Sequence, residues 1–279
     1  MSPSKAVHTK LSRLKNDLKA SEAVLVAFSG GVDSTLLAKV SMDVLGEDCH
    51  AITCVSPTMA KNEIRDAISL GAELGFGDRH HIVESNELER PGFSENPTHR
   101  CALCKTELMH HAAPLAQKLN AKIVLGTNTN DLGDLRPGIE AARKQGAHSP
   151  FVDADLNKSE IRILSKELGL RTWDKPQLAC LSSRFPYGTE ITKERLESVD
   201  QFESFLWDFG LSNVRVRYHD NVARIEIDSK DMETLIQDEN RLKVVAAGKS
   251  AGFNYIALDL QGFRSGSLNE PLVQLQKKH

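Results

Sequence analysis

The amino-acid sequence predicts an α/β protein, with a doubly wound parallel sheet followed by a smaller α+β domain. Three observations support this fold class. Up to about residue 170, short apolar runs alternate with segments of helical periodicity, which is the order typical of parallel α/β sheets. Residues 171–188 then combine a high density of Pro and Gly with no visible period, as a linker does. Beyond them the pattern changes, so we expect domains at residues 1–188 and 189–279.

The first domain is expected to alternate buried strands with helices. Each strand is a short apolar run rich in β-branched residues, which suits a strand covered on both faces. Each helix carries apolar residues at helical spacing, and Gly46 ends the second one. The expected strands are residues 23–29, 49–55, 79–84 and 121–127. The expected helices are residues 8–20, 34–46, 59–75, 101–120 and 157–170, with a short one at 139–146.

The second domain is expected to contain two helices and three strands. Alternation of apolar and polar residues over 213–228 predicts a hairpin, in which Arg215 and Arg217 share one face of a strand. The expected order is a helix at 191–210, the hairpin at 213–228, a single helix at 229–252 and a strand at 253–263.

Composition limits the classes of function. The hydrophobic fraction is 40% and the charged fraction is 26%, values of a globular chain. Lys and Arg number 35 against 38 Asp and Glu, a formal charge of −3, so no global positive field is available to attract nucleic acid. No apolar run approaches the roughly 18 residues of a membrane span, and the charged N-terminus lacks a signal-peptide core. We therefore expect a cytoplasmic protein without a membrane or nucleic-acid partner.

The sequence Ser29-Gly30-Gly31-Val32-Asp33-Ser34 connects the first expected strand to a helix. At such a turn, backbone N–H groups and the positive end of the helix bind phosphate. The glycines let the backbone approach the anion, and the serines add hydroxyl donors. The Asp33 carboxylate suits this pocket when Mg²⁺ lies between it and the phosphates. Because Walker A and G-x-G-x-x-G patterns are absent, we expect nucleotide binding without hydride transfer. The alternative is a Gly-Gly turn with Asp as helix cap.

A second group of candidate residues follows the fourth expected strand. Gly126, Thr127 and Asn128 end that strand, and the polar stretch after it contains Asp131 and Arg136. If the fourth strand lies beside the first, these residues face the same crevice at the carboxyl edge of the sheet. The alternative is a polar surface loop.

Three of the five cysteines are candidate ligands or nucleophiles. An odd number argues against a disulfide framework. Cys101 and Cys104 start an expected helix, whose N-terminus favours thiolate. With Cys180 they form a set that suits a [4Fe–4S] cluster with one open iron. A zinc site with a fourth ligand, a redox dithiol and unrelated surface thiols are the alternatives. Cys49 and Cys54 lie in a strand pattern, so we expect them in the core.

Six motifs together resemble one family. They are SGGVDS, RCALCK, GTNTNDLGDLRPG, ACLSSRFPYG, VRVRYHDNVARIEI and LDLQGFRSG. The combination resembles the sulfur transferases of lactate racemase cofactor maturation (the LarE family), whose Gly-rich loop is the PP-loop of ATP pyrophosphatases. The similarity runs through both domains and implies the adenine nucleotide α-hydrolase-like form of the α/β fold.

The resemblance implies a reaction on pyridinium-3,5-biscarboxylic acid mononucleotide, the precursor of the nickel-pincer cofactor. A substrate carboxylate attacks the α-phosphate of MgATP, sulfur then displaces AMP, and a thiocarboxylate results. ATP is thus expected at residues 29–34, Gly126, Asp131 and Arg136, where Asp33 and Ser34 are the catalytic candidates. The family's substrate positions fall on Arg184, Glu203, Arg215, Arg217 and Arg264, with Arg215 and Arg217 matching the pair that holds the substrate phosphate.

One departure from the family concerns the source of sulfur. Members that sacrifice the sulfur of a single cysteine lack the C-x-x-C, and their donor aligns with Ala179, one residue before Cys180. With Cys101 and Cys104 present, the sequence is similar to the subgroup that carries a [4Fe–4S] cluster. Cys180 as a sacrificial donor is the alternative. The family also implies a homo-oligomer, with other cofactor-maturation proteins as partners.

Three other functions share some of these features. A PP-loop tRNA thiolase would share the loop but needs a positive surface for its nucleic acid. An ammonia-using amidating synthetase, of the NAD or GMP synthetase kind, has no use for three placed cysteines. A regulatory module with a structural zinc would bind ATP without releasing pyrophosphate.

Overall fold

The computed structural model describes residues 5–132, 137–176, 179–211, 213–264 and 267–269. The chain falls into two compact units. The first comprises Met1–Arg90 and Thr98–Leu178, and the second comprises Pro91–Pro97 and Ala179–His279. The second unit thus begins before residue 188, and it includes a short segment from the first half of the chain.

The first unit is built on a four-stranded parallel sheet with the order β3-β2-β1-β4. The strands are β1 (Val24–Ala27), β2 (Cys49–Val55), β3 (His80–Glu84) and β4 (Lys122–Val124). All four lie where the apolar runs predict strands, although β1 and β4 are shorter than expected. β2 and β4 pair with opposite sides of β1, so the strand order reverses there. Open α/β sheets bind ligands at such a switch point, beyond the carboxyl ends of the strands.

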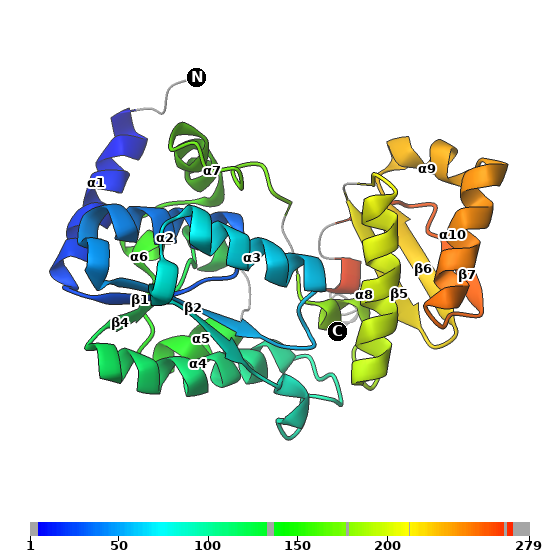
Figure 1. The fold of residues 1–279 in the computed structure, drawn as a ribbon, viewed down its shortest axis with the longest axis horizontal. Helices are drawn as coiled ribbons and strands as arrows, with labels where there is room; N and C mark the ends of the chain where they lie inside the picture. The colour runs from blue at the N-terminus through cyan, green and yellow to red at the C-terminus, as the bar shows by residue number, and fades with distance from the viewer. Residues whose placement is uncertain (1–4, 133–136, 177–178, 212, 265–266, 270–279) are drawn as a thin grey trace, which may run out of the picture. The chain divides into compact units, whose positions relative to one another are not determined.

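Helices cover both faces of this sheet (Figure 1). Side chains alternate along β1, so Val24 and Val26 pack with one helix layer and Leu25 packs with the other. The first layer consists of α1 (Lys5–Ala20), α2 (Val32–Leu45), α3 (Lys61–Glu73), α6 (Pro150–Asp153) and α7 (Lys158–Glu167). The second layer consists of α4 (Arg100–Leu119) and α5 (Pro137–Lys144). The doubly wound α/β class predicted from the sequence is therefore confirmed.

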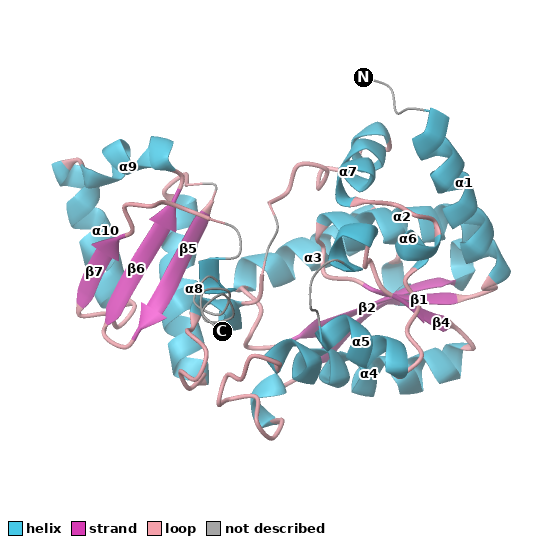
Figure 2. Ribbon diagram, turned by 180° about the vertical axis from the view of Figure 1, so that it is seen from behind, coloured by secondary structure: helices cyan, strands magenta, loops and turns pink. Residues whose placement is uncertain are grey.

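The second unit contains a three-stranded sheet with the order β5-β6-β7, shown in Figure 2. The strands are β5 (Val214–His219), β6 (Val222–Ile227) and β7 (Tyr255–Leu258), and α8 (Lys193–Asp208) precedes them. β5 and β6 form the expected antiparallel hairpin, and β7 pairs with β6 in parallel. Val214 and Val216 are fully buried in the core. Arg215 and Arg217 alternate with them and therefore share the opposite face of β5.

The sequence predicts one helix over residues 229–252, and this expectation is wrong. The structure has two helices, α9 (Ser229–Ile236) and α10 (Asp238–Ser250), separated by Gln237 with a ψ of 141°. Acidic Asp238 and Glu239 occupy the first turn of α10, where the helix dipole favours them. The Asn240 amide donates a 2.8 Å hydrogen bond to the Thr234 carbonyl at the end of α9. Local polar contacts thus stabilise the break.

The segment Pro91–Pro97 joins the second unit through hydrogen bonds that sequence patterns do not reveal. Gly188 N donates to Asn96 O at 3.0 Å, and Ile191 N donates to Ser94 O at 2.8 Å. The Asn96 amide, which is fully buried, donates to Pro186 O at 2.7 Å. These contacts link the segment to residues just before α8.

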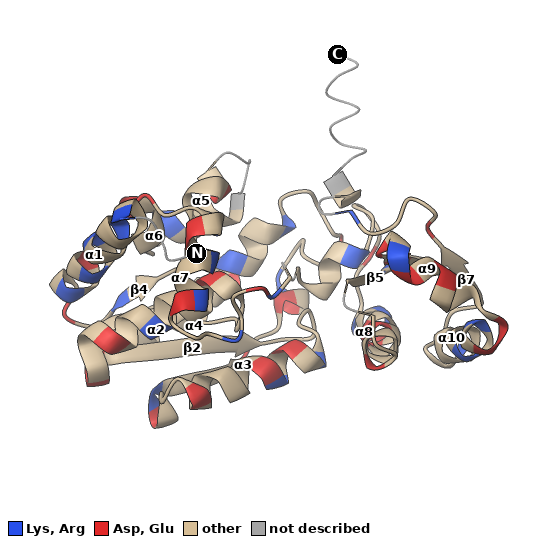
Figure 3. Ribbon diagram, turned by 90° about the horizontal axis from the view of Figure 1, so that it is seen from above, with Lys and Arg blue, Asp and Glu red and all other residues tan. Residues whose placement is uncertain are grey.

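Charged side chains of both signs occur along the helices of each unit (Figure 3). This mixed distribution agrees with the formal charge of −3. No helix in the described part of the chain is both long and apolar enough to cross a bilayer.

Candidate functional site

The loop between β1 and α2 has the geometry of an anion-binding site. Gly30 adopts a left-handed conformation with a φ of +68°, and Gly31 precedes the helix with an extended backbone. The first intrahelical hydrogen bond runs from Thr35 N to Gly31 O at 2.9 Å, so the amides of residues 32–34 precede the helical ladder. Among the described residues, no side chain caps this end of α2. These amides and the helix dipole can therefore bind an anion.

Packing explains why glycine is needed at position 30. A Cβ added to Gly30 would lie 3.0 Å from the Cα of Ala67 in α3, and the positive φ is itself unfavourable for other residues. The hydroxyl oxygens of Ser29 and Ser34 lie 3.2 Å apart across the same turn. The loop thus brings the two predicted serines together on a backbone that α3 holds in place.

The carboxylate of Asp33, the second residue of α2, is held by two neighbours. Lys158 Nζ donates to Oδ2 at 2.5 Å, and Asn128 Nδ2 donates to Oδ1 at 3.4 Å. The side chains of Asp33 and Lys158 are 25% and 29% exposed, so solvent reaches the pair. The Lys158 ammonium is thus the cation that pairs with this carboxylate, and the role of Asp33 in holding Mg²⁺ stays a prediction.

The residues that follow β4 reach the loop, as expected from a strand beside β1. A Cβ on Gly126 would lie 3.0 Å from both the Asp33 carbonyl carbon and Ser34 N, so the two backbones are in close contact. Asn128 contacts the Asp33 carboxylate, as described above. Asp131 instead accepts a 3.0 Å hydrogen bond from Asn128 N, and its carboxylate therefore stabilises the turn after β4.

Lys158 is a residue of this site that sequence reasoning missed. It is the first residue of α7, directly after the Asn157 cap, and its backbone N–H donates to Asn130 Oδ1 at 2.8 Å. The sequence did contain a signal for Lys158, because a lysine in the first turn of a helix is unfavourable with the helix dipole and needs a negative partner. The structure shows what offsets that cost, since the ammonium group pairs with Asp33.

Lys175 is a second missed residue beside the loop. Its ammonium donates to Gly30 O at 3.0 Å and pairs with Asp66 of α3. Burial alone would raise the pKa of Asp66, yet hydrogen bonds from Lys175 and Arg171 leave that pKa below its ordinary value. Asp66 thus stays charged and anchors Lys175 on the left-handed turn. Lys175 lies in the aperiodic stretch before the second unit, where no pattern singles it out.

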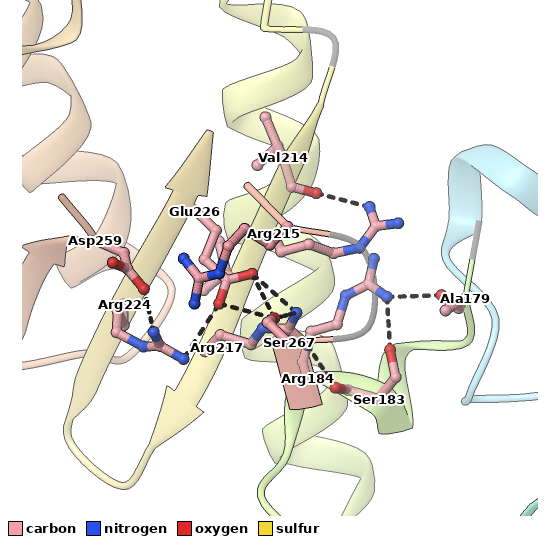
Figure 4. A network of polar contacts seen from close by, with 12 residues as sticks. Ala179, Ser183, Arg184, Val214, Arg215, Arg217, Arg224, Glu226, Asp259 and Ser267 are labelled. Atoms are coloured by element: carbon pink, nitrogen blue, oxygen red, sulfur yellow. Dashed lines mark hydrogen bonds and ion pairs between the residues drawn. The ribbon is translucent and has the colours of Figure 1, made fainter. Parts of the chain in front are cut away.

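In the second unit, a group of charged side chains forms what we call the arginine cluster (Figure 4). It consists of Arg184, Arg215, Arg217 and Arg224 with the carboxylates of Glu203, Glu226 and Asp259. Arg184, Arg215 and Arg217 are 1%, 6% and 7% exposed, low values for charged residues. Buried guanidinium groups that carboxylates and carbonyl oxygens hold in place are suited to bind an anionic ligand.

Arg184 and Glu203 form a bidentate ion pair. Arg184 Nε and Nη2 each donate to a Glu203 oxygen at 2.8 Å. Glu203 Oε1 also accepts a 2.7 Å hydrogen bond from Val216 N. Arg184 Nη1 donates to Ala179 O at 2.7 Å and to Ser183 Oγ at 2.9 Å. Both predicted substrate residues are therefore engaged with protein groups, and together they connect the segment after Ala179 to α8 and β5.

Arg215 and Arg217, the predicted phosphate ligands, have different partners. Arg217 Nη1 donates to Ser183 O at 2.7 Å, and its Nη2 donates to Glu226 at 2.8 Å. The Arg215 guanidinium lies 5.3 Å from the centre of the Phe263 ring, within the range of a cation–π contact.

Arg264, which the resemblance also places near the substrate, donates to Gly262 O at 3.3 Å. Arg136, the remaining predicted nucleotide residue, lies outside the described residues.

The candidate cysteines divide between the two units. Cys101 and Cys104 lie in the first turns of α4, and Cys180 lies in the second unit. The Cys104 thiol is 3.8 Å from the buried carboxylate of Glu87. Within the described residues, the structure gathers no three His, Cys, Asp or Glu side chains into a metal site. The three-cysteine site therefore stays a prediction.

The two cysteines of β2 behave as expected for core residues. Cys49 is fully buried and belongs to the core beside α2, and Cys54 packs against the core of the opposite layer. Burial raises the pKa of both thiols to about 12. Neither is a nucleophile at neutral pH, because the thiolate is the reactive form.

Comparison with known proteins places these features in a family context. The model of the NAD synthase family matches residues 6–130, which include the loop. The pyridinium-3,5-bisthiocarboxylic acid mononucleotide synthase of Lactiplantibacillus plantarum is 36% identical over 96% of this chain and 96% of its own. An uncharacterised protein of Synechocystis is 43% identical over 96% of this chain and 100% of its own. An ammonia-dependent NAD⁺ synthetase of Methanococcoides burtonii is 25% identical over 53% of this chain and 58% of its own.

Proposed function

Since this chain belongs to the family of the pyridinium-3,5-bisthiocarboxylic acid mononucleotide synthases, we propose that it is an ATP-dependent sulfur transferase of nickel-pincer cofactor biosynthesis. It adenylates the carboxylates of pyridinium-3,5-biscarboxylic acid mononucleotide and converts them into thiocarboxylates. The observation that carries this proposal is the similarity to the Lactiplantibacillus synthase, which spans nearly the whole of both chains and thus includes both the loop and the arginine cluster.

The loop of residues 29–34 binds the phosphates of ATP in this proposal. The amides at the start of α2 and the hydroxyls of Ser29 and Ser34 donate hydrogen bonds to the departing pyrophosphate. Asp33 would hold Mg²⁺, which supplies charge neutralisation on the phosphates when it is bound. Gly126 keeps the chain after β4 against this loop, and Asp131 and Arg136 complete the nucleotide site.

We also assign Lys158 to this nucleotide site. Its ammonium pairs with Asp33 at 2.5 Å, and it comes from a helix start that Asn157 and Asn130 hold in place. The same ammonium can turn to a phosphate oxygen when the Asp33 carboxylate has a metal partner. Lys158 thus offsets the charge of Asp33 in the free protein and that of pyrophosphate in the complex.

The chemistry proceeds in two displacement steps. A substrate carboxylate oxygen attacks the α-phosphorus of ATP, the bond to the β-phosphate oxygen breaks, and pyrophosphate leaves. A sulfur nucleophile then attacks the carbonyl carbon of the acyl adenylate, and AMP leaves. A carboxylate is a poor electrophile by itself, so adenylation supplies the leaving group that the second step needs.

In this proposal the substrate is bound by one part of the arginine cluster, which consists of Arg184, Glu203, Arg215 and Arg217. Arg215 and Arg217 bind its phosphate, for which paired guanidinium groups are suited. Arg184, Glu203 and Arg264 lie around the remainder of the molecule. The burial of these arginines supports this assignment, because buried guanidinium groups suit an anion and a dicarboxylate mononucleotide is strongly anionic.

Two sources of sulfur are open to this chain. Cys101, Cys104 and Cys180 would hold a [4Fe–4S] cluster, which supplies a bound sulfide and allows repeated turnover. Alternatively Cys180 is sacrificed: its Cα loses a proton, the Cβ–Sγ bond breaks, and dehydroalanine remains. The C-x-x-C at the start of α4 supports the cluster. We further propose a cytoplasmic homo-oligomer that works with other cofactor-maturation proteins.

Pyrophosphate release tests the adenylation step. With ATP and the dicarboxylate mononucleotide, we expect wild-type protein to release pyrophosphate and Asp33→Asn to lose this activity. Asp43→Asn is the matched control, because Asp43 lies on the same helix and pairs with Lys39 at its surface. Absence of release from wild type would refute the proposed function, and unchanged release from Asp33→Asn would remove Asp33 from the site.

Iron and acid-labile sulfide per chain, measured after anaerobic purification and reconstitution, test the sulfur source. A four-iron cluster in wild type that is lost in Cys180→Ala supports the cluster. Protein without iron that loses the elements of H₂S from its mass during turnover supports the sacrificial route.

A further inference from the structure

Glu226 of β6 is a buried carboxylate for which neither the resemblance nor the proposed reaction gives a role. It is 0% exposed, and it lies between two arginines of the cluster (Figure 4). Its Oε2 accepts from Arg217 Nη2 at 2.8 Å, and its Oε1 lies 3.2 Å from Arg224 Nη2. Each carboxylate oxygen therefore has its own guanidinium group.

The register of the hairpin explains why a carboxylate is needed there. Arg217 on β5 lies directly opposite Arg224 on β6, and like charges in such cross-strand pairs repel. Glu226 is two residues along β6 from Arg224, on the same face of the strand. Its carboxylate bridges the two guanidinium groups and removes the repulsion that would otherwise drive them apart.

The bridge also determines which part of Arg217 can meet a ligand. Nη1 donates to Ser183 O, and Nη2 donates to Glu226 and to Ser267 Oγ, all at 2.7–2.8 Å. Among the described residues, none accepts a hydrogen bond from the buried Nε of Arg217. An unpaired buried donor is costly, so this N–H is suited to an acceptor brought in by a ligand.

Arg224 differs from Arg217 in this respect. Its Nη2 pairs with Glu226, and its Nη1 pairs with Asp259 just beyond β7. Two carboxylates therefore engage Arg224, and its side chain is 35% exposed against 8% for Arg217. Arg224 serves to balance the charge of Glu226, whereas Arg217 keeps a donor for the ligand.

We propose that Glu226 is a positioning residue that orients Arg217 toward the phosphate of the nucleotide substrate. This inference rests on the proposed function, since it refines how the arginine cluster recognises its substrate. Glu226 itself does not contact the phosphate. It sets the direction of the guanidinium group, and Arg217 makes the contact.

Glu226→Gln is the most direct test. Glutamine has one carbonyl oxygen and one NH₂ group, so it accepts from one arginine and presents donors to the other. The quantity to measure is kcat/KM for pyrophosphate release with the mononucleotide, divided by kcat/KM with the nucleoside that lacks the phosphate. Because both values come from the same preparation, the fraction of active protein cancels in this ratio.

We expect Glu226→Gln to lower this ratio about tenfold or more, as the loss of a charge-assisted hydrogen bond implies, with kcat at saturating mononucleotide unchanged. Arg224→Gln is the matched control, because it breaks the same buried network but leaves the Glu226–Arg217 contact in place. It should lose thermal stability and keep the ratio. Equal losses of the ratio in both variants, or an unchanged ratio in Glu226→Gln, would overturn the inference.

Two further measurements keep the test decisive. If Glu226→Gln does not fold, Glu226→Asp retains the negative charge but is one methylene too short to bridge both arginines, and it should lower the ratio as well. If wild type releases no pyrophosphate with the mononucleotide, the proposed function fails on its own. The positioning role of Glu226 is then tested separately with ribose 5-phosphate as the probe. Its dissociation constant is measured by calorimetry, with excess pyrophosphate present to occupy the loop of residues 29–34. It should rise about tenfold or more in Glu226→Gln, and an unchanged value would overturn the inference.

Discussion

Removing Arg184 should destabilise the second unit far more than neutralising its partner Glu203. The two side chains are 1% and 6% exposed, so solvent does not screen the pair. Arg184→Met leaves the Glu203 carboxylate with Val216 N as its remaining partner among the described residues. Removing one member of a buried ion pair costs about 3–5 kcal/mol, because the other charge stays buried without compensation. We expect a loss in that range for Arg184→Met.

Glu203→Gln should cost less, about 1–3 kcal/mol, because Arg184 has other acceptors. Its Nη1 still donates to Ala179 O at 2.7 Å and to Ser183 Oγ at 2.9 Å. The asymmetry follows from the structure alone, since a simple two-residue ion pair would lose similar free energies from either side. In the double variant the two losses should not add, because neither charge is left alone.

The two tryptophans of the chain provide the assay. Trp207 lies on α8 in the second unit, and Trp173 lies in the first. In a Trp173→Phe background, Trp207 fluorescence during urea unfolding therefore reports the second unit by itself. A loss below 1 kcal/mol for Arg184→Met, or a larger loss for Glu203→Gln than for Arg184→Met, would refute this account of the pair.

Three other outcomes are expected. Gly126→Ala should raise the KM for ATP at least fivefold in the pyrophosphate assay, because overpacking against the loop backbone costs about 1–3 kcal/mol; an unchanged KM would contradict the close contact at that position. Arg215→Ala should raise the KM for the mononucleotide and leave that for ATP intact, and the reverse pattern would assign Arg215 to the nucleotide site. At pH 8, iodoacetamide should label the exposed Cys101 well before Cys54, whose pKa of about 12 keeps it protonated until far higher pH. Mass spectrometry of the labelled peptides measures this order, and equal rates would contradict the burial of Cys54.

The elements of the first unit could be predicted because their signals are local. A strand such as β2 is a continuous apolar run, and its observed bounds are those read from the sequence. The loop of residues 29–34 was recognisable for the same reason, since strand, glycines and helix follow one another without interruption. The order of the strands in the sheet depends on contacts between distant segments. The sequence therefore did not predict that β4 lies beside β1, and the shared crevice was expected only if it did.

The missed residues depend on contacts between distant parts of the chain. Lys158 reaches Asp33 across 125 positions, and Lys175 reaches Gly30 across 145. No periodicity within a window of ten or twenty residues can reveal such pairs. The same holds for the segment Pro91–Pro97, whose place in the second unit depends on backbone hydrogen bonds to residues near 188 and 191.

The arginine cluster illustrates why net charge bears on one class of ligand and says little about another. A formal charge of −3 argues against a polyanion, because nucleic acid binds through many exposed cations that release counterions. A small anion needs only a few donors held in the correct directions. In the proposed site those donors are buried guanidinium groups held by carboxylate or carbonyl oxygens, as Glu203 holds Arg184 and Ser183 O holds Arg217. Their carboxylate partners offset the charge, and the Arg217 Nε has no acceptor among the described residues, so a small-anion site of the proposed kind would not appear in the composition.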